Sequence, residues 1–370
     1  MKLRINKNDL QEGISAAIRA TTSNSTQTIL SNLFITAKND SIQIIGNNLE
    51  LYIETKEIYA DVYEEGTICL DAKLFYEIVK KAQGIDIQIT VEKNNSVIIT
   101  SNKRQMKMHG IDASDFPLIT HEIGPRFNME SRILCDLLKQ TIYAISSDNA
   151  KPILTGSLIE VENNLIKTVG CDMFRMAYNY AKIKDVKQAI RVIVAKKSLV
   201  ETINFLSEDE DVEIQVTQKY IVLELDKYRI TSRFIEGEYI NYNNIFNEQN
   251  AKTTAKINRK EFINVLECAL LLASKEACIG KVSKATLKIE KGQITTKVNN
   301  EHGALIEETT AEIEGKELEI IFNTKYLLEA LSVIKDDEVT MHFGGELSPC
   351  IIQGNGNNKH LVVPMMPAKK

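Results

Sequence analysis

The sequence lacks the features that mark several common classes of protein. No apolar run approaches the ~20 residues needed to span a bilayer, and residues 1–4 lead into an alternating pattern typical of a strand instead of a signal peptide. The six cysteines include no C-x-x-C pair, which argues against a disulfide framework and against a zinc site. We therefore expect a cytoplasmic protein that needs no metal or other cofactor.

Motifs of the common enzyme classes are missing as well. There is no G-x-G-x-x-G after a strand, no G-x-x-x-x-G-K-[ST], no H-E-x-x-H and no G-x-S-x-G. The five histidines are dispersed, and none has a cysteine at metal-ligand spacing. An enzyme is still the first rival class for a chain of this length, but the sequence predicts no catalytic site.

The bulk composition sets the size and charge of the protein. A chain of 370 residues is too long for one hydrophobic core, so two or three domains are expected. With 44% hydrophobic and 26% charged residues, the chain should be globular throughout. The formal net charge of −5 argues against a protein that coats nucleic acid through positive charge alone.

One pattern occurs three times along the chain, at offsets of 124 and 128 residues. A segment that begins with lysine and ends with glutamate recurs at 73–77, 197–201 and 325–329. The same offsets align an apolar i, i+4, i+7, i+8 stripe that starts at Leu10, Leu134 and Phe262. Each copy reads as strand, helix, several strands, helix, several strands. The sequence therefore predicts an α+β fold with two helices per repeat packed on antiparallel sheets.

Turn-rich segments divide these repeats near residues 120 and 248. The predicted domains are 1–120, 121–248 and 249–370. Three tandem copies of some other small α+β domain, joined like beads, would show the same repeats. The short linkers favour a continuous array instead.

The predicted helices are the positively charged part of an acidic chain. The segments 7–21, 72–82, 130–146, 196–206, 258–275 and 323–335 together carry +5, so the remainder carries −10. On segment 72–82, one face contains Lys73, Glu77, Lys80 and Lys81, and the expected buried stripe contains Leu74, Phe75, Ile78 and Val79. Such a face can neutralise phosphates without reading bases. An ordinary solvated helix face explains the same pattern.

Five segments resemble one known family. They are Asp115-Phe116-Pro117, residues 151–156 (KPILTG), 171–177 (CDMFRMA), 322–326 (FNTKY) and 361–365 (LVVPM). In this order and spacing, the whole chain resembles the bacterial sliding clamps, which are the β subunits of DNA polymerase III. The resemblance implies a non-catalytic processivity factor made of three repeated clamp domains. It also implies a head-to-tail homodimer whose helices line a ring around duplex DNA.

The resemblance further implies a hydrophobic groove between the second and third domains. There the DNA polymerase III catalytic subunit, the clamp loader, other polymerases and mismatch-repair proteins would insert short linear motifs. The groove residues would be Lys151, Leu154, Cys171, Phe174, Arg175, Met176, Ile240, Ile245, Asn323, Tyr326, Leu361, Val363, Pro364 and Met365. Without the resemblance, most of them would be assigned to the core.

Two further surfaces follow from the resemblance and the charge pattern. The residues expected to face DNA are Lys73, Lys80, Lys81, Lys196, Lys197, Arg259 and Lys325. The dimer contact would place Met106 and Met108 against Leu272 and Ala273 of a second copy. The alternating segment 106–108 fits an edge strand that extends a sheet across the interface. A strand satisfied within its own sheet fits the sequence equally well.

The chain departs from the family pattern at three places. The usual Thr-Asp-x-His-Arg-Leu-Ala reads here with Cys171, Phe174 and Met176, which predicts a more apolar groove. The loop 23–28 lacks the basic residue and the proline that commonly precede Ile29, so no DNA contact is expected from it. Residues 366–370 extend past the usual end. The second rival is a protein scaffold that never meets DNA, and charge reversal of the basic helix face would distinguish it.

Overall fold

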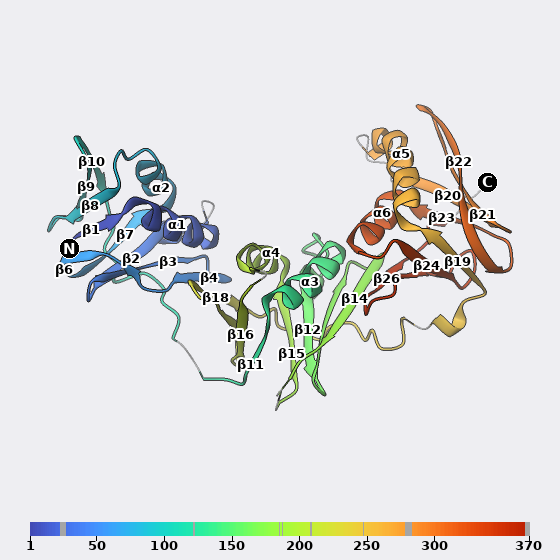
Figure 1. Cartoon of the computed structure of the whole chain (residues 1–370), viewed down its shortest axis with the longest axis horizontal. Helices are drawn as coiled ribbons and strands as arrows, with labels where there is room; N and C mark the ends of the chain where they lie inside the picture. The colour runs from blue at the N-terminus through green and yellow to red at the C-terminus, as the bar shows by residue number, and fades with distance from the viewer. Residues whose placement is uncertain are drawn as a thin grey trace. The chain divides into compact units, whose positions relative to one another are not determined.

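The computed structural model describes residues 1–22, 27–120, 123–184, 186, 188–207, 209–246, 248–277 and 283–366, without the side chains of 273–277. The chain forms two compact units. Unit 1 contains residues 1–132 and 200–234, and unit 2 contains residues 133–199 and 235–370. In both units, helices pack against antiparallel sheets (Figure 1).

The predicted order of elements occurs three times, which confirms the α+β fold. The first repeat contains β1 (Lys2–Asn6), α1 (Lys7–Ala17), β2 (Asn32–Lys38), β3 (Ser41–Asn47), β4 (Leu51–Thr55), β5 (Ile58–Tyr59), β6 (Asp61–Glu64), β7 (Gly66–Asp71), α2 (Ala72–Lys80), β8 (Asp86–Val91), β9 (Ser96–Ser101) and β10 (Arg104–His109). The second contains β11 (Arg126–Glu130), α3 (Ser131–Thr141), β12 (Gly156–Glu162), β13 (Leu165–Cys171), β14 (Arg175–Lys182), β15 (Ile190–Ala195), α4 (Lys196–Phe205), β16 (Asp211–Val216), β17 (Tyr220–Glu224) and β18 (Tyr228–Arg233). The third contains β19 (Thr253–Asn258), α5 (Arg259–Ala277), β20 (Lys284–Glu290), β21 (Gln293–Asn300), β22 (Gly303–Gly315), β23 (Leu318–Asn323), α6 (Thr324–Val333), β24 (Glu338–Phe343), β25 (Cys350–Gln353) and β26 (Lys359–Val362).

Unit 1 has α1 and α2 side by side over its strands (Figure 1). Its two sheets have the orders β10-β9-β8-β1-β6 and β11-β16-β17-β18-β4-β3-β2-β7. Helix α2 begins after Asp71 because the Asp71 carboxylate accepts a hydrogen bond from the backbone N–H of Leu74 at 2.8 Å. The helix buries Phe75, Ile78 and Val79 as predicted. Leu74 was expected in that buried stripe, but it is 51% exposed.

Unit 2 is built around one continuous path of strands. The order is β15-β12-β13-β14-β26-β25-β24-β19-β22-β21-β20-β23. The long strand β22 pairs with β21 over 303–310 and with β19 over 311–315. Helices α5 and α6 lie side by side, and their apolar faces share a core with Phe322, Met341 and Phe343.

Neighbouring repeats are joined by strand pairing, which excludes independent beads. The last strand of the second repeat, β18, pairs with β4 of the first repeat. The last strand of the third repeat, β26, pairs with β14 of the second. Within the described residues, β10 has only β9 as a neighbour, and residues 303–310 of β22 have only β21. These two edges are therefore open.

The described residues contain neither a membrane-spanning helix nor a metal cluster. No helix among them is long and apolar enough to cross a bilayer. No group of three or more His, Cys, Asp or Glu side chains in the same residues is placed to hold a metal ion. The thiols of Cys69, Cys171 and Cys350 are buried, and burial raises the pKa of the Cys69 thiol to about 12. These cysteines therefore serve as small apolar groups.

Candidate partner-binding site and basic helix face

The predicted groove residues divide into a buried group and a surface group, all in unit 2. Leu154, Cys171, Met176 and Leu361 are at most 6% exposed and share one apolar cluster with the half-buried Ile240, Ile245 and Val363. Arg175 is also buried, at 8% exposure. The half-buried residues outside this cluster are Asn323, Tyr326, Pro364 and Met365, and the exposed ones are Lys151 and Phe174. The structure thus brings most of the set together, with an apolar floor beneath a smaller accessible surface.

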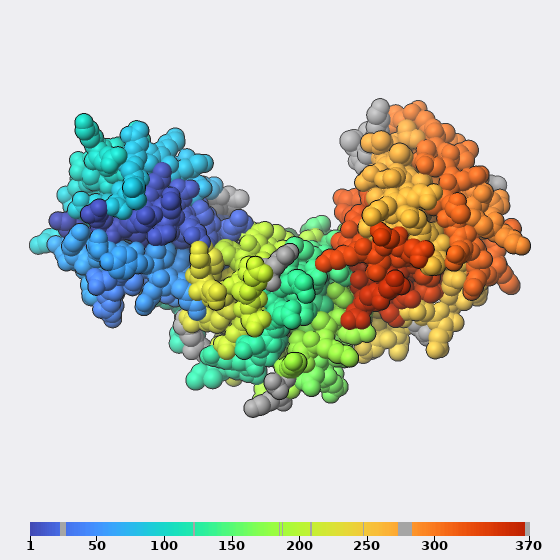
Figure 2. All heavy atoms as spheres, viewed as in Figure 1, coloured from blue at the N-terminus to red at the C-terminus, as the bar shows by residue number. Residues whose placement is uncertain are grey.

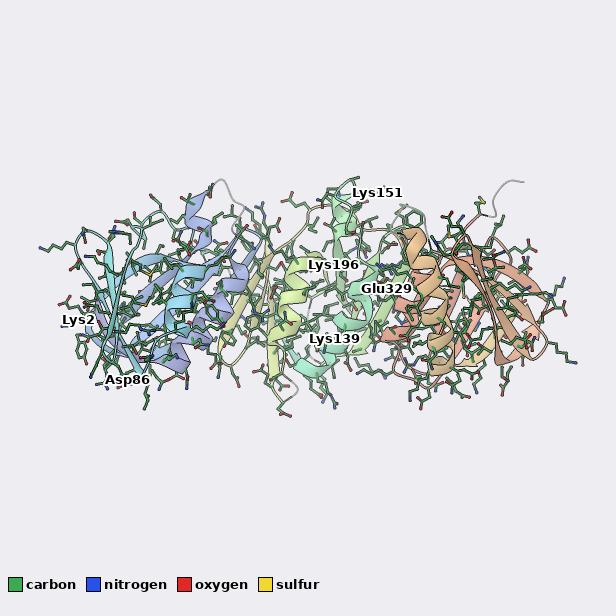
Figure 3. All side chains as sticks on the ribbon, turned by 90° about the horizontal axis from the view of Figure 1, so that it is seen from above. Lys2, Asp86, Lys139, Lys151, Lys196 and Glu329 are labelled. Carbon is green, nitrogen blue, oxygen red and sulfur yellow. The ribbon has the colours of Figure 1, made fainter. Side chains whose placement is uncertain are left out.

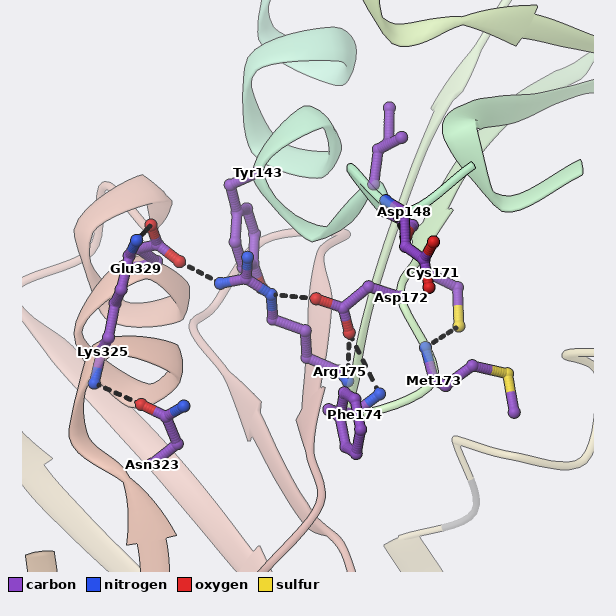
Figure 4. A network of polar contacts seen from close by, with 12 residues as sticks. Tyr143, Asp148, Cys171, Asp172, Met173, Phe174, Arg175, Asn323, Lys325 and Glu329 are labelled. Atoms are coloured by element: carbon purple, nitrogen blue, oxygen red, sulfur yellow. Dashed lines mark hydrogen bonds and ion pairs between the residues drawn. The ribbon is translucent and has the colours of Figure 1, made fainter. Parts of the chain in front are cut away.

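A tight turn between β13 and β14 exposes two apolar side chains. One carboxylate oxygen of Asp172 accepts hydrogen bonds from the backbone N–H groups of Phe174 and Arg175, both at 3.0 Å. Met173 has a φ of 78°, a conformation in which bulky residues are rare. The turn leaves Met173 50% exposed and Phe174 59% exposed (Figure 4). An exposed apolar pair held by a rigid turn suits an interaction surface.

Arg175 ties this turn to helix α6. Its Nε donates to Asp172 at 2.9 Å, and its terminal nitrogen forms an ion pair with Glu329 (Figure 4). The guanidinium carbon lies 4.5 Å from the ring centre of Tyr326 and 5.2 Å from that of Tyr143. Burial acts to lower the pKa of Arg175, but the carboxylates of Glu329 and Asp172 outweigh it and raise that pKa. The residue is therefore a permanent cation shared by two carboxylates and two aromatic rings.

The C-terminal strand completes the surface around Phe174. The backbone N–H of Val363 donates to the carbonyl of Phe174 at 2.8 Å, and that of Met365 donates to Ile321 at 2.7 Å. The ring of Phe174 stacks on Tyr326 with centroids 6.3 Å apart. In the space-filling view, the red C-terminal part of unit 2 adjoins the green segment around α3 (Figure 2). The result is an accessible apolar strip of Met173, Phe174 and the residues that follow β26.

A group of buried polar side chains connects β14 and the residue before β26 to helix α3. The side-chain oxygen of Gln140 accepts from the amides of Asn179 at 3.0 Å and Asn358 at 2.8 Å. The hydroxyl of Tyr143 lies 3.0 Å from Nδ1 of His360, which is fully buried. Among the described residues, Nε2 of His360 has no hydrogen-bond partner. A charged imidazolium would have no acceptor there, and burial lowers the pKa of His360 to about 3.

His360 should make the protein less stable in mild acid. The unfolded chain binds a proton near pH 6.5 that the folded chain does not, so stability falls as the pH drops from 6.5 toward 3. Between pH 6.5 and 4.5 the expected loss is about 2–3 kcal/mol. The measurement is the urea unfolding midpoint at these two pH values for the wild type and for His360→Gln. The variant should lose less stability over this interval, and an equal loss in both proteins would contradict the assignment.

The residues expected to face DNA differ in how accessible their charges are. The exposed ones are Lys73, Lys80, Lys81, Lys197 and Lys325. Lys196 is half-buried, and its Nζ donates to the carbonyl of Ile145 at 3.1 Å; burial, followed by the charge of Arg175, lowers the pKa of Lys196. Arg259 is also half-buried, and its Nε donates to the carbonyl of Asp336 at 2.6 Å. Both residues therefore have backbone partners that compete with phosphate.

Sequence reasoning missed several residues of these surfaces. Seen from above, Lys139 of α3 lies in the same part of unit 2 as Lys196 and Glu329, with Lys151 at the edge (Figure 3). Lys139 is exposed, yet no signal in the repeat points to it. Glu329 did have a signal, since glutamate recurs at 77, 201 and 329. Asp172 and Met173 had only their place in the family-like segment 171–177. Tyr143 had no signal, because its contacts with Arg175 and His360 join residues distant in the sequence.

The predicted dimer residues whose side chains are described lie on β10 and on helix α5, beside the open half of β22. On β10, Met108 is 4% exposed and Met106 is half-buried, and both pack on the core of unit 1. In unit 2, Leu272 is half-buried beside Leu305 in a small cluster around Ala269. The side chain of Ala273 lies outside the described residues, as do loop residues 23–26 and the C-terminal residues 367–370. The two methionine side chains therefore pack within unit 1. Among the described residues, the outer edge of β10 has no neighbouring strand.

The chain is similar to proteins of one family over its whole length. It matches the N-terminal, central and C-terminal domains of the DNA polymerase III beta subunit over residues 1–120, 128–241 and 246–368. It is 30% identical to the Beta sliding clamp of Bacillus subtilis, with 100% of each chain covered. Among solved structures, it is similar to the DNA polymerase sliding clamp from Bacillus subtilis (TM-score 0.94, 29% identity) and to a DNA polymerase III beta subunit from Eubacterium rectale (TM-score 0.94, 30% identity); 99% of each chain is covered in both cases.

Proposed function

Because the chain belongs to the DNA polymerase III β-subunit family, the bacterial sliding clamps, we propose that two copies close head to tail into a ring around duplex DNA. The chain is a non-catalytic processivity factor, and the ring would tether the replicative polymerase during synthesis. Each copy would contribute three domains, 1–120, 121–248 and 249–370. Six domains with two helices each would then surround the DNA.

The pair of open edges is the observation that supports ring closure best. At both internal junctions, the last strand of one repeat pairs with the fourth strand of the repeat before it. Two such strands are left over, β10 of the first repeat and the 303–310 half of β22 in the third. Their charges are opposite: β10 and the turn before it contain the exposed Lys103, Arg104 and Lys107, and β22 contains the half-buried Glu307 and the exposed Glu308. A head-to-tail partner would cover both edges.

The exposed lysines of the helices support contact with DNA that does not depend on base sequence. Lys73, Lys197 and Lys325 occupy the same position in the three repeats and are all exposed. Lysine neutralises phosphates without base readout, and an encircling ring needs little affinity to stay on DNA. A ring of this kind would be compatible with both a net charge of −5 and a DNA partner.

We further propose that the strip around Met173 and Phe174 binds short linear motifs of partner proteins. These partners would be the DNA polymerase III catalytic subunit, the clamp loader, other polymerases and mismatch-repair proteins. The exposed aromatic ring of Phe174 and the buried floor at Leu154 and Met176 suit a peptide with adjacent apolar side chains. Exposed Lys151 at the rim favours an acidic residue in the same peptide.

Retention on circular DNA tests the ring. After treatment with a clamp loader, a dimeric ring should stay on nicked circles and slide off linear DNA. A variant with Lys73, Lys80, Lys197 and Lys325 changed to Glu should remain a dimer by light scattering but lose retention, because the helix face would then repel phosphates.

The matched control carries the same charge change outside the helices, at Lys93, Lys219, Lys252 and Lys291, which are all exposed. This control should be retained like the wild type. A monomeric wild type, or equal retention of both quadruple variants, would favour the scaffold alternative.

A further inference from the structure

The two internal junctions are built on one strand register. At the first junction, in unit 1, Thr231 of β18 lies opposite Tyr52 of β4. At the second junction, in unit 2, Leu361 of β26 lies opposite Met176 of β14. Tyr52 and Met176 occupy the same position of the repeat, 124 residues apart. Thr231 and Leu361 are therefore equivalent positions, and the sheet faces that contain them can be compared side chain by side chain.

At the second junction, the linker between β18 and β19 covers this sheet face. The linker contributes Tyr242 and Phe246, which share an apolar cluster with Leu361 and Ile351. The ring centres of Tyr242 and Phe246 lie 5.6 and 5.7 Å from that of Tyr178 on β14. A chain segment with aromatic side chains thus completes the second junction.

At the first junction, the equivalent sheet face forms a cavity. Val222 of β17 is the equivalent of Ile351, because it lies opposite Thr231 as Ile351 lies opposite Leu361. Val222 and Thr231 line a cavity of about 460 Å³ whose walls belong wholly to unit 1. The described linker residues at its wall include no aromatic ring, and one of them, Ile123, is 94% exposed. The volume is in the range of ligand sites.

Thr231 gives this cavity a buried hydroxyl group without a partner. The residue is 1% exposed, and within the described residues its Oγ1 has no hydrogen bond. Leaving a buried hydroxyl unpaired is unfavourable, so such a group needs an explanation. The equivalent Leu361 has no polar side-chain atom at this place. The hydroxyl of Thr231 is therefore available to an occupant of the cavity.

The charged side chains around the cavity are paired with one another. Arg126 forms an ion pair with Glu213 at 3.0 Å. Glu224 pairs with both Lys56 and Arg229. These three cations and two carboxylates leave the wall close to neutral. A guanidinium group such as that of the half-buried Arg229 can also stack on an aromatic ring. A neutral ring with one hydroxyl group fits this wall better than a phosphate or a carboxylate.

We propose that this cavity binds a tyrosine side chain of a partner protein, as the second junction holds Tyr242 of its own linker. Tyr242 is 4% exposed, and its hydroxyl donates to Glu160 at 3.1 Å. At the first junction, the phenol would form a hydrogen bond with Thr231 while its ring covers Val222. Tyrosine supplies both the apolar ring and the polar group that these two residues need.

This site is separate from the strip around Met173 and Phe174, because the strip lies in unit 2. The inference therefore depends neither on ring closure nor on the proposed peptide site. Its ligand is a peptide segment with a tyrosine, because a chain segment occupies the equivalent face of unit 2.

A labelled peptide tests the proposal on the full-length chain. The probe is a fluorescein-labelled peptide with the sequence of residues 238–246, and its matched control has phenylalanine in place of Tyr242. Fluorescence anisotropy should show that Thr231→Val binds the tyrosine peptide about fivefold more weakly than the wild type does, as expected for one lost hydrogen bond. The phenylalanine peptide should bind both proteins equally. Phe174→Ala should bind the tyrosine peptide like the wild type.

Three results would overturn the proposal. The tyrosine peptide might fail to bind the wild type, it might bind Thr231→Val with unchanged affinity, or its binding might be lost in Phe174→Ala. The urea unfolding midpoint of Thr231→Val gives a second test that needs no ligand. It should equal or exceed that of the wild type, because the substitution removes an unpaired buried hydroxyl. A lower midpoint would mean that the hydroxyl already has a partner in the chain, and the cavity would then lack its polar group.

Discussion

Reversing the charge at the β10 edge is expected to convert the dimer into monomers. If β10 paired with residues 303–310 of β22 of a second copy in the register that joins β18 to β4 and β26 to β14, Arg104 would lie opposite Glu307 of the partner subunit and Lys103 opposite Glu308. Glu307 and Glu308 form no ion pair among the described residues of their own chain. Arg104→Glu with Lys103→Glu would replace two attractive pairs by two repulsive ones. Like charges placed together at an interface cost several kcal/mol, so the dissociation constant should rise roughly hundredfold or more, at about 1.4 kcal/mol per tenfold.

The reciprocal change should restore the dimer. Adding Glu307→Arg and Glu308→Lys to the reversed chain regenerates both pairs with opposite polarity. Lys93→Glu, which changes an exposed lysine away from the edge, is the matched control and should leave the molar mass unchanged. Light scattering across a dilution series measures all three. A reversed chain that stays dimeric, or one that the reciprocal change fails to rescue, would place the dimer contact elsewhere.

Removing Arg175 is expected to weaken both the fold of unit 2 and partner binding. Arg175→Met leaves the carboxylates of Asp172 and Glu329 without their cation and withdraws it from two aromatic rings. Breaking a buried pair on one side costs roughly 3–5 kcal/mol. We expect about 3 kcal/mol, at the low end, because the side chain of Glu329 is 33% exposed. The urea unfolding midpoint measures this loss.

A second substitution separates stability from binding. Phe174→Ala changes a side chain that is 59% exposed, so the unfolding midpoint should stay nearly constant. Its affinity for a fluorescent peptide with adjacent aromatic and aliphatic residues should nevertheless fall, as is usual for a central aromatic anchor. Arg175→Met combined with Glu329→Leu should recover much of the midpoint, since apolar replacement of a buried pair is often neutral. If Phe174→Ala bound the peptide with unchanged affinity, the partner site would lie elsewhere than around Met173 and Phe174.

The exposure of Leu74 shows what an apolar sequence pattern cannot predict. Its spacing with Phe75, Ile78 and Val79 predicts a common buried stripe, and three of the four residues are indeed buried. Leu74 is exposed because it occupies the edge of that stripe, at the repeat position where Tyr326 contacts Arg175 across a junction. A periodic pattern identifies an apolar face. It does not say whether the covering partner is the same domain, the next repeat or another copy.

The same limit applies to the charged residues. The sequence identifies Lys196 and Arg259 as basic residues at the start of a helix, like Lys73. Only the structure shows that both donate to backbone carbonyls, those of Ile145 and Asp336, more than fifty residues away in the chain. Lys197, the next residue after Lys196, is instead exposed to solvent. A count of charges in the sequence cannot distinguish the accessibility of these two lysines.

By itself, the sequence determined the repeat, the order of strands and helices and the positive charge of the helices. These features depend on local periodicity and on residue type, which are properties of short segments. The tertiary structure alone decided how the repeats join and which side chains meet there. Arg175 of β14 meets Tyr326 and Glu329 of α6 because β26 of the third repeat pairs with β14. Strand register and long-range packing place such residues together, and no short segment encodes that contact.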